Sequence, residues 1–420
     1  MVNTIEEKIL SGIEIAKRNL NGVTDITPVH LIDRLSKKYS ANIYFKREDL
    51  QKVRSFKIRG AYNKIFQLSN DEKKKGVVTA SAGNHAQGVA FSCSKLKVKG
   101  VIFMPKITPL QKINRVKYFG EKYIEVILDG ENYDQSSHLA KEYAKKTGAI
   151  YVHAFDDEKV IAGQGTIGCE IFEQLNGEID YVISAIGGGG LISGIALYLK
   201  SKKESIQIVG VESKGTQSMH LSLKKNEVVS LDSIDTFCDG IAVKKVGDLT
   251  YQICKKFVDY TFTVDEGKVA SEIIDLFQNE GIVIEPASAT TIAVLDKLKD
   301  RIKKKNVVCI ISGGNFDLLR YPETLEKSLI YHGLKHYFLI EFAQKPGQLK
   351  RFVNNVLGPD DDIVLFEYIK KNNKEKGPAL IGIELKKAED LNKIIKNLKE
   401  QNFHYQVVSH NDLLYKYLVL

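Results

Sequence analysis

The sequence predicts an α/β protein that carries a smaller domain at its C-terminal end. From Gly76 to Asn315, short apolar runs alternate with helical patterns. Repeated β-α units of this kind form a parallel sheet with helices on both faces. After about residue 325 the order becomes βαββαβ, which is the ferredoxin-like arrangement. We therefore expect one domain over residues 1–325 and a second over residues 335–410.

The first half of the chain begins with an amphipathic helix over residues 4–20. The Thr27-Pro28-Val29 sequence then interrupts the pattern. Strands are expected at 43–46, 77–80, 98–104 and 123–128, and helices at 60–68, 86–96 and 133–147. Thr108-Pro109-Leu110 starts one more helix, with proline in the first turn, where its missing N–H group does no harm.

The second half repeats the alternation before the pattern changes. Strands are expected at 181–186, 208–212 and 306–311, and helices at 163–175, from the glycine run to about 203, at 264–280 and at 287–298. In the C-terminal domain we expect strands at 336–343, 363–370, 379–385 and 404–409, with helices at 347–357 and 389–401. This second domain has no glycine-rich loop and no cluster of catalytic residue types, so a sensing or interface role is expected.

The composition argues against several function classes. The net charge is +9, but the lysines lie in scattered clusters without interleaved aromatic residues, so a solvated surface is expected rather than a nucleic-acid partner. The five cysteines are far apart and form no C-x-x-C pair, which argues against a disulfide framework or a zinc site. No apolar signal core or bilayer-length run is present, so we expect a cytoplasmic protein without a membrane partner.

Lys57 lies between Phe56 and Ile58, just before a predicted helix. Burial lowers the pKa of a lysine and makes it usable as a nucleophile or base, which is the state that forms a Schiff base with an aldehyde cofactor. An isolated lysine between apolar residues is more often a solvated surface residue, because lysine is almost never fully buried. The catalytic interpretation therefore depends on three further motifs.

The first of these motifs is the run Gly187, Gly188, Gly189, Gly190 and Leu191, which connects a predicted strand to a predicted helix. Glycines let the backbone approach an anion, and the N–H groups at a helix N-terminus point toward it. A plain tight turn is the alternative, but four consecutive glycines favour a phosphate site. No Gly-Lys-Ser/Thr follows, and the dinucleotide fingerprint is incomplete, so neither of those nucleotide motifs is supported.

The second motif, Ser81, Ala82, Gly83, Asn84 and His85, also joins a predicted strand to a helix. Such a turn offers backbone donors to a second anion, for instance a substrate carboxylate. The Asn84 side chain can donate to a phenolic oxygen. His85 is a candidate general base, although a packed, hydrogen-bonded histidine is the favoured interpretation.

The third motif, Ser312-Gly313-Gly314-Asn315, ends the last strand of the main domain. A serine hydroxyl can bond to a ring nitrogen without adding charge. Loops at the carboxyl ends of the strands line the ligand crevice of an open α/β fold. The motifs can therefore meet in one place, where they match the needs of a phosphorylated pyridine aldehyde: an imine lysine, a partner for its phenolic oxygen, a phosphate cup and a ring-nitrogen partner.

Together these motifs resemble those of the fold-type II pyridoxal-phosphate enzymes, specifically the threonine dehydratase (threonine ammonia-lyase) family of the biosynthetic type. The resemblance covers roughly residues 5–325, and the C-terminal part resembles the family's ACT-like regulatory domain. It rests on 46–51, 55–61, 81–88, the glycine run, 239–243, 285–287 and 312–315. Ser-Ala-Gly-Asn-His separates the chain from the cysteine-synthase branch, which typically has Thr-Ser-Gly-Asn-Thr. The resemblance implies two open twisted α/β subdomains, the smaller roughly over 50–150.

The resemblance also implies residue roles around the cofactor pyridoxal 5′-phosphate. Lys57 would bind the cofactor covalently, Phe56 would lie against its ring, and Asn84 would bind its O3′ oxygen. The run from Gly187 to Leu191 would bind the phosphate and Ser312 the pyridine nitrogen, while residues 81–85 would hold the substrate carboxylate. Serine racemases of this branch have an acidic metal site, but here Glu212 is followed by Ser-Lys-Gly-Thr, so no metal is expected.

The implied reaction converts L-threonine to 2-oxobutanoate and ammonia, the entry to isoleucine biosynthesis, with L-serine as a secondary substrate. A catabolic serine/threonine deaminase is one alternative, against which the ACT-like domain argues, and a racemase-like enzyme is another. The non-enzymatic alternative is an amino-acid sensor built on an inactive cofactor fold. Intact Lys57, Asn84 and Ser312 disfavour it.

The C-terminal domain is expected to be allosteric, with isoleucine or valine as the effector by family resemblance. Only one βαββαβ unit is present, whereas some relatives carry two. A purely structural or oligomer-forming role is the rival interpretation. Since closed symmetric oligomers are common among soluble enzymes, we expect a homodimer or homotetramer.

Overall fold

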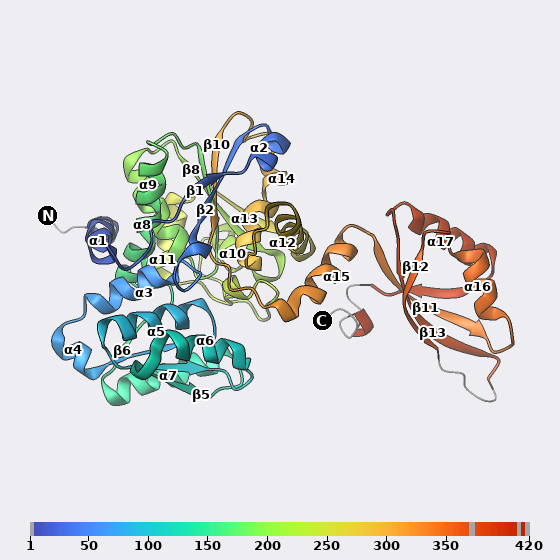
Figure 1. The fold of residues 1–420 in the computed structure, drawn as a ribbon, viewed down its shortest axis with the longest axis horizontal. Coiled ribbons are helices and arrows are strands. Elements are labelled where there is room, and N and C mark those ends of the chain that lie inside the picture. Colours follow the sequence, from blue (N-terminus) through green and yellow to red (C-terminus); the bar gives the residue numbers. More distant parts are fainter. Residues whose placement is uncertain (1–3, 369–373, 410–412, 416–420) are drawn as a thin grey trace. The chain divides into compact units, whose positions relative to one another are not determined.

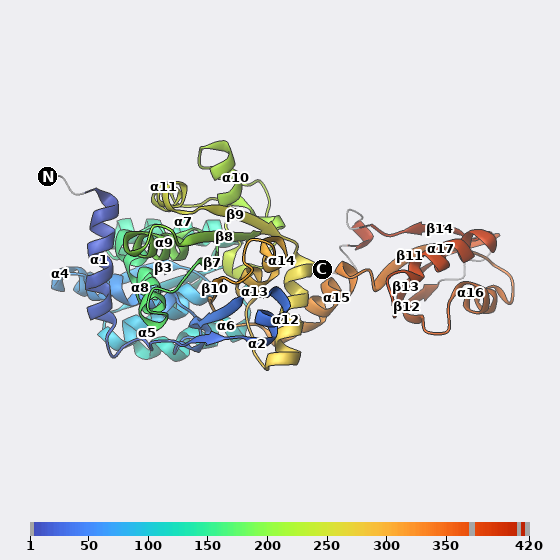
Figure 2. The ribbon, with the colours of Figure 1, turned by 90° about the horizontal axis from the view of Figure 1, so that it is seen from above.

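The computed structural model describes residues 4–368, 374–409 and 413–415. Contacts divide the chain into two compact units, Met1–Phe316 and Asp317–Leu420. The first unit holds a six-stranded and a four-stranded sheet, and the second holds another four-stranded sheet (Figures 1 and 2). The predicted fold class, an α/β protein with a βαββαβ domain, is confirmed. In the described part of the chain, no helix has the length and apolar character needed to cross a membrane.

The six-stranded sheet is the larger part of the first unit. Its strand order is β1 (Val29–Leu31), β2 (Asn42–Arg47), β10 (Asn306–Ile311), β7 (Tyr181–Ala185), β8 (Gln207–Ser213) and β9 (Tyr260–Val264). Neighbouring strands are parallel except for β1, which pairs with β2 in the antiparallel sense. The carboxyl ends of the parallel strands therefore lie along one edge of the sheet, where α/β folds bind ligands.

Helices cover both faces of this sheet. Val307, Cys309 and Ile311 of β10 join one apolar core, and Val308 and Ile310 join the other, as the alternation of a strand requires. The first core contains α2 (Asp33–Tyr39), α12 (Glu266–Glu280), α13 (Pro286–Ala293) and α14 (Leu295–Leu298). The second contains α1 (Ile5–Leu20), α8 (Glu158–Gln174), α9 (Gly190–Lys202) and α11 (Asp248–Phe257).

The smaller sheet of the first unit is entirely parallel and has the order β5 (Ile124–Leu128), β4 (Gly100–Met104), β3 (Val77–Ala80) and β6 (Ile150–Tyr151). One of its cores contains α3 (Lys57–Phe66), α5 (Asn84–Leu96) and α6 (Leu110–Gly120), and the other contains α7 (Tyr133–Thr147). Figure 1 shows these helices gathered around the small sheet, with α3 on the side nearest the large sheet. Lys57 therefore lies where the two sheets meet.

The second unit has the chain order β11 (Lys335–Ala343), α16 (Gln348–Val356), β12 (Asp362–Tyr368), β13 (Lys376–Glu384), α17 (Asp390–Glu400) and β14 (His404–Val407), preceded by α15 (Tyr321–Tyr331). Its sheet is antiparallel, in the order β12-β13-β11-β14. Phe352 of α16 and Leu398 of α17 pack on Phe338 of β11 in one core. The end of the strand predicted at 363–370 lies outside the described residues.

Several predicted boundaries were wrong because side-chain caps or pairing partners decide them. The predicted helix from Val264 begins at Glu266, since Val264 ends β9 and Asp265 caps the helix. The predicted helix from Gly163 begins at Glu158, where the Asp157 carboxylate accepts the N–H groups of Lys159 and Val160. Such caps satisfy N–H groups that the helix itself leaves unpaired.

Other elements near the N-terminus also differ from the prediction. The interruption at Thr27-Pro28-Val29 leads directly into the short edge strand β1, and α2 after it was not predicted. The helix predicted from Gly60 begins at Lys57 itself, and Pro109 lies just before α6 rather than in its first turn. The remaining elements are α4 (Asn70–Lys75), α10 (Ser218–Lys225) and short 3-10 helices at Glu48–Leu50, Glu121–Tyr123, Lys214–Thr216, Asp239–Ile241 and Leu318–Arg320.

Candidate active site

A pocket opens beyond the carboxyl ends of β7 and β10, beside the first residues of α3 and α5. The space in and around its open mouth amounts to about 480 Å³. Its lining residues are Phe56, Lys57, Asn84, Phe155, Ala185, Gly187, Gly188, Gly189, Gly190, Leu191, Gly240, Ile241, Glu285, Ala287 and Ser312. The structure thus brings together every residue predicted to touch the cofactor. Of the predicted substrate loop, Asn84 lines the pocket, whereas Ser81, Ala82, Gly83 and His85 do not.

Lys57 is the first residue of α3, and its amine donates to the Ala154 carbonyl oxygen at 2.9 Å. Desolvation lowers the pKa of Lys57 to about 8, against the opposing charge of Glu285. The backbone holds the lysine to the end of β10, since the Phe56 N–H group donates to the Ser312 carbonyl at 3.0 Å. A fraction of the amine is therefore neutral near pH 7, as a nucleophile or base requires.

The glycine run connects β7 to α9 and could not carry larger residues. A Cβ atom at Gly188 would overlap the Phe155 ring, and one at Gly190 would lie 2.8 Å from the Phe155 carbonyl oxygen. Gly189 has a φ of +93°, in the left-handed region. The Thr250 hydroxyl donates to the Gly188 carbonyl at 2.6 Å and fixes the loop. Because the first N–H groups of a helix lack intrahelical acceptors, this tight turn is suited to a phosphate.

Glu285 lines the pocket, although the sequence motif Glu285-Pro286-Ala287 gave it no role. The Asn84 amide donates to both carboxylate oxygens at 2.9 Å, and the Asn315 N–H group donates to Oε1 at 2.9 Å. The Asn315 side chain donates in turn to Asn84 Oδ1 at 2.8 Å. Burial raises the pKa of Glu285 to about 7. A carboxylate directly before a helix that begins with Pro286 was the available signal, but its contact with Asn84 depends on residues 201 positions apart.

Ser312 follows β10, and its hydroxyl lies 3.1 Å from the Ser288 hydroxyl of α13. Ser288 accepts from the Gly313 N–H group at 3.0 Å and donates to the Gly313 carbonyl at 2.9 Å. These bonds hold the start of the Ser-Gly-Gly-Asn loop against α13. Ser312 therefore presents an uncharged hydroxyl to the pocket from a fixed position.

His85 lies inside α5 rather than on the pocket wall. Its Nε2 atom is 3.0 Å from the Val152 carbonyl oxygen and donates to it. Within the described residues, its Nδ1 atom has no hydrogen-bond partner. Burial lowers the pKa of His85 to about 3, so the ring is neutral near pH 7. This is a packed, hydrogen-bonded histidine, and a charge on it is not available to bind a carboxylate.

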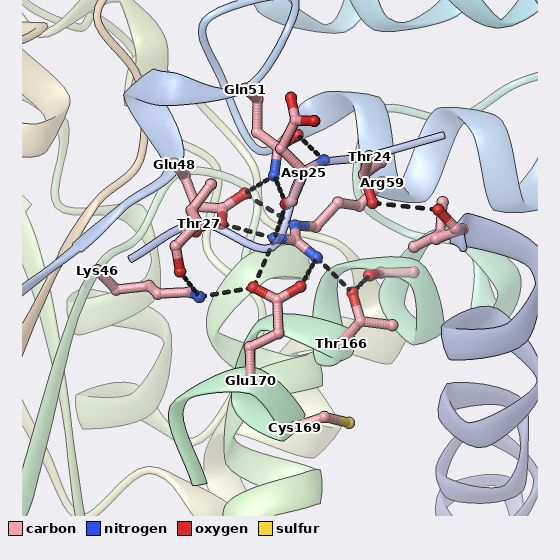
Figure 3. A network of polar contacts seen from close by, with 12 residues as sticks. Thr24, Asp25, Thr27, Lys46, Glu48, Gln51, Arg59, Thr166, Cys169 and Glu170 are labelled. Carbon is pink, nitrogen blue, oxygen red and sulfur yellow. Dashed lines mark hydrogen bonds and ion pairs between the residues drawn. The ribbon is translucent and has the colours of Figure 1, made fainter. Parts of the chain in front are cut away.

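A buried network of charges lies beneath the helix that begins with Lys57 (Figure 3). The Arg59 guanidinium donates to Glu48 at 2.8 Å and to Glu170 at 3.0 Å, and the Lys46 amine donates to Glu170 at 2.6 Å. Glu48, Arg59 and Lys46 are at most 1% exposed. The network joins the segment after β2 to α3 and α8, so it anchors the segment on which Lys57 lies.

Glu212, the carboxylate considered for a metal, lies one residue before the end of β8 and contacts the start of α10. Its oxygens accept from the N–H groups of Met219 at 2.9 Å and His220 at 2.6 Å. Burial raises the pKa of Glu212 to about 8. In the parts of the chain that the structure describes, no group of three or more metal-binding side chains comes together. The expectation of no metal stays a prediction.

Comparison with known proteins identifies the family. Residues 21–313 match the pyridoxal-phosphate-dependent enzymes, and residues 326–418 match the C-terminal regulatory domain of threonine dehydratase. The chain is 50% identical over 410 residues to the biosynthetic L-threonine dehydratase of Halalkalibacterium halodurans, covering 98% of this chain and 99% of that protein. The chain belongs to the threonine dehydratase family. A second relative, the biosynthetic L-threonine dehydratase of Bacillus subtilis, is 47% identical over 404 residues, covering 96% of each chain.

Solved structures of this family resemble the fold closely. Threonine deaminase isoform 2 of Solanum lycopersicum superposes with a TM-score of 0.73 and 38% identity, covering 77% of this chain and 94% of that one. Maize serine racemase superposes with a TM-score of 0.71 and 32% identity, covering 77% and 98%. These matches confirm the predicted family, enzyme class and cofactor. As a threonine dehydratase family member, the protein uses pyridoxal phosphate.

The pocket residues fit this cofactor on structural grounds. The amine of Lys57 has a lowered pKa and faces the pocket. The glycine run packs so closely against Phe155 and Thr250 that only glycine fits there, and the absence of side chains leaves its backbone N–H groups accessible to a phosphate. Ser312 offers an uncharged partner for a ring nitrogen. Lysine, anion cup and hydroxyl are the groups that pyridoxal phosphate requires.

Proposed function

We propose that the protein is an L-threonine ammonia-lyase that converts L-threonine to 2-oxobutanoate and ammonia, the first step of isoleucine biosynthesis. L-Serine is the secondary substrate. The observation that carries this proposal is Lys57, with its lowered pKa, in a glycine-lined pocket on a chain that also has the regulatory domain. The regulatory domain also favours the biosynthetic reaction over the catabolic alternative.

In this proposal the pocket residues divide the tasks of the reaction. Lys57 would hold the cofactor and, as a free amine, would remove the α-proton of threonine. Asn84 binds the O3′ oxygen, Phe56 lies against the ring, the run from Gly187 to Leu191 binds the phosphate, and Ser312 bonds to the ring nitrogen. Pyridoxal phosphate supplies an electron sink for the electron pair left at the α-carbon. The β-hydroxyl group would leave with one proton as water, and addition of water to the resulting enamine would give 2-oxobutanoate and ammonia.

The substrate carboxylate is assigned to residues 81–85, which lead into the first turn of α5 and offer their backbone N–H groups as donors. Because His85 is neutral, it contributes through the shape of the loop and not through charge. Glu285 adds a carboxyl group that the sequence did not indicate, and its hydrogen bond fixes the Asn84 amide. The raised pKa of Glu285 favours its protonated, uncharged form, and an uncharged carboxyl group does not repel an anion that binds beside it.

The first test is the visible absorbance of the purified protein before and after L-threonine, with 2-oxo acid release measured in the same cuvette. We expect a yellow lysine-bound cofactor band that shifts on addition of threonine, together with oxo-acid release. Cofactor binding without turnover would instead support the amino-acid sensor. A protein that stays colourless with added pyridoxal phosphate would contradict the proposal.

We propose that the chain consists of a catalytic domain over residues 1–325 and a regulatory domain over residues 335–410. The second domain would regulate the first allosterically, with isoleucine as the effector and valine as a second effector. The substrate saturation curve is measured with each amino acid, on the full chain and on a chain that ends at residue 329. We expect isoleucine to shift the curve of the full chain only. An unchanged curve in every case would contradict regulation and favour a structural domain.

Assembly and location complete the proposal. We expect a homodimer or homotetramer, which sedimentation equilibrium of the purified chain measures directly. The cytoplasmic location stays a prediction, and fractionation of the source cells tests it.

A further inference from the structure

The segment from Val152 to Asp157, which connects β6 to α8, contacts both halves of the pocket. The Ala154 carbonyl accepts from the Lys57 amine at 2.9 Å. The Phe155 ring occupies the space where Gly188 would carry a Cβ atom. The Asp156 carboxylate accepts from the Thr250 N–H group at 3.1 Å, and the Thr250 hydroxyl donates to the glycine run. The conformation of this short segment therefore determines where the lysine and the phosphate cup lie.

The side chain of His153 bonds to the backbone of this same segment. His153 Nδ1 accepts the N–H groups of Phe155 at 3.2 Å and Asp156 at 2.8 Å. Its ring meets the Phe155 ring edge to face, with the centroids 4.6 Å apart. An imidazole nitrogen accepts a hydrogen bond only when it carries no proton. Burial lowers the pKa of His153 to about 4, so the accepting form is present near pH 7.

We propose that His153 is a positioning residue that acts on Lys57 through the Ala154 carbonyl and on the glycine run through Phe155. By accepting the N–H groups of the consecutive residues Phe155 and Asp156, His153 folds the segment so that the Ala154 carbonyl faces the Lys57 amine. When the Lys57 amine is neutral and donates this hydrogen bond to the Ala154 carbonyl, its lone pair points away from that carbonyl. This inference deepens the proposed function and rests on the role of Lys57 in it.

The sequence allows a sharp pair of variants. In His153→Asn, the side-chain oxygen can accept the N–H groups two and three residues on, as asparagine does in an Asx turn. In His153→Leu, the side chain is apolar and leaves both N–H groups without that acceptor. His138→Leu is the matched control, because His138 lies on α7 and its side chain is 72% exposed.

The readout is binding of pyridoxal phosphate to each apoprotein, followed by the growth of the lysine-bound band and by the dissociation constant, with kcat and KM for threonine measured afterwards. We expect His153→Leu to bind the cofactor about 10-fold or more weakly, since two hydrogen bonds of ordinary strength are lost. His153→Asn should stay within about 3-fold of the native protein, and His138→Leu should match it.

Native cofactor binding by His153→Leu would overturn the inference. If that variant does not fold, His153→Asn decides: native binding supports the acceptor role, and weakened binding overturns it. Lys57→Ala separates this inference from the function on which it rests. A Lys57→Ala protein that still develops the lysine-bound band would contradict the role of Lys57, whatever the His153 variants do.

Discussion

Two lysines, the fully buried Lys46 and the half-buried Lys57, lie eleven residues apart in the sequence, in very different surroundings. The Lys46 amine donates to the Glu170 carboxylate at 2.6 Å, the Thr27 carbonyl at 2.6 Å and Gln174 at 3.0 Å (Figure 3). Within the described residues, the Lys57 amine donates to the Ala154 carbonyl. Of these two lysines, only Lys57 faces the open pocket. Desolvation lowers the pKa of both amines, but the Lys57 amine has fewer hydrogen-bond acceptors around it and therefore remains able to react.

The carboxylates of the two regions show the same contrast. Burial would raise the pKa of Glu48, but the Arg59 charge and hydrogen bonds hold it below its usual value. Glu285 has amide partners instead of a cation, and burial raises its pKa to about 7. The difference shows that a balanced set of buried charges anchors the structure, whereas an unbalanced one leaves groups that exchange protons near neutral pH.

The largest expected effect is the separation of activity from stability at Lys57. Lys57→Met should lower threonine turnover by at least about 10³-fold, because nucleophile and base are lost together. Its unfolding midpoint in urea should stay at or above the native value, since an incompletely paired and largely desolvated amine is removed from a half-buried position. Native turnover in this variant would remove the contrast between the two lysines.

Arg59→Met should have the opposite outcome. Removing the guanidinium leaves Glu48 and Glu170 buried without their main cation, and breaking a buried pair in this way costs about 3–5 kcal/mol. Urea unfolding measures the loss of stability. Cofactor binding is measured separately, without urea and at a low temperature at which the protein stays folded. Arg59→Lys is the control that keeps the charge and loses the paired geometry. A native unfolding curve for Arg59→Met would mean that the network does not anchor α3.

The two carboxylates should give opposite pH dependences. Because the pKa of Glu285 is raised in the folded protein, native stability relative to Glu285→Gln should fall as the pH rises from about 4.5 to 7, by about 3 kcal/mol. The pKa of Glu48 is lowered in the folded protein. The native protein should therefore gain stability over Glu48→Gln above about pH 4.5 and lose this gain in more acid solution. Urea midpoints of the apoproteins between about pH 2 and pH 8 measure both. Equal slopes would contradict the comparison.

The smallest expected effect concerns Thr27, whose hydroxyl donates to Glu48 at 2.6 Å. Thr27→Val keeps the shape and the backbone carbonyl that Lys46 contacts, but it removes this donor. We expect a loss of about 1–2 kcal/mol in the free energy of unfolding, with unchanged kcat for threonine. A change in kcat without a change in stability would mean that the network acts on the reaction directly.

The motifs of the candidate site were readable from the sequence because each is local. Four glycines between a strand and a helix, a serine after the last strand, and Asn84 at a strand-to-helix turn are short patterns with their own chemistry. Since parallel strands bring their carboxyl ends to one edge, the pattern also predicted that these residues meet. The caps at Asp157 and Asp265 were missed because hydrophobic periodicity does not mark the first turn of a helix.

The sequence by itself determined the family, the cofactor and the alternation of strands and helices, and it predicted nine of the fifteen residues that line the pocket. Tertiary structure alone decided which buried groups are paired. Lys46 and Arg59 find Glu170 across more than one hundred positions of the chain, and Glu285 finds Asn84 across 201. His153 and the Ala154 carbonyl carried no motif at all. The reason is physical: desolvation and charge pairing depend on neighbours in space, and a local pattern of residues does not specify those neighbours.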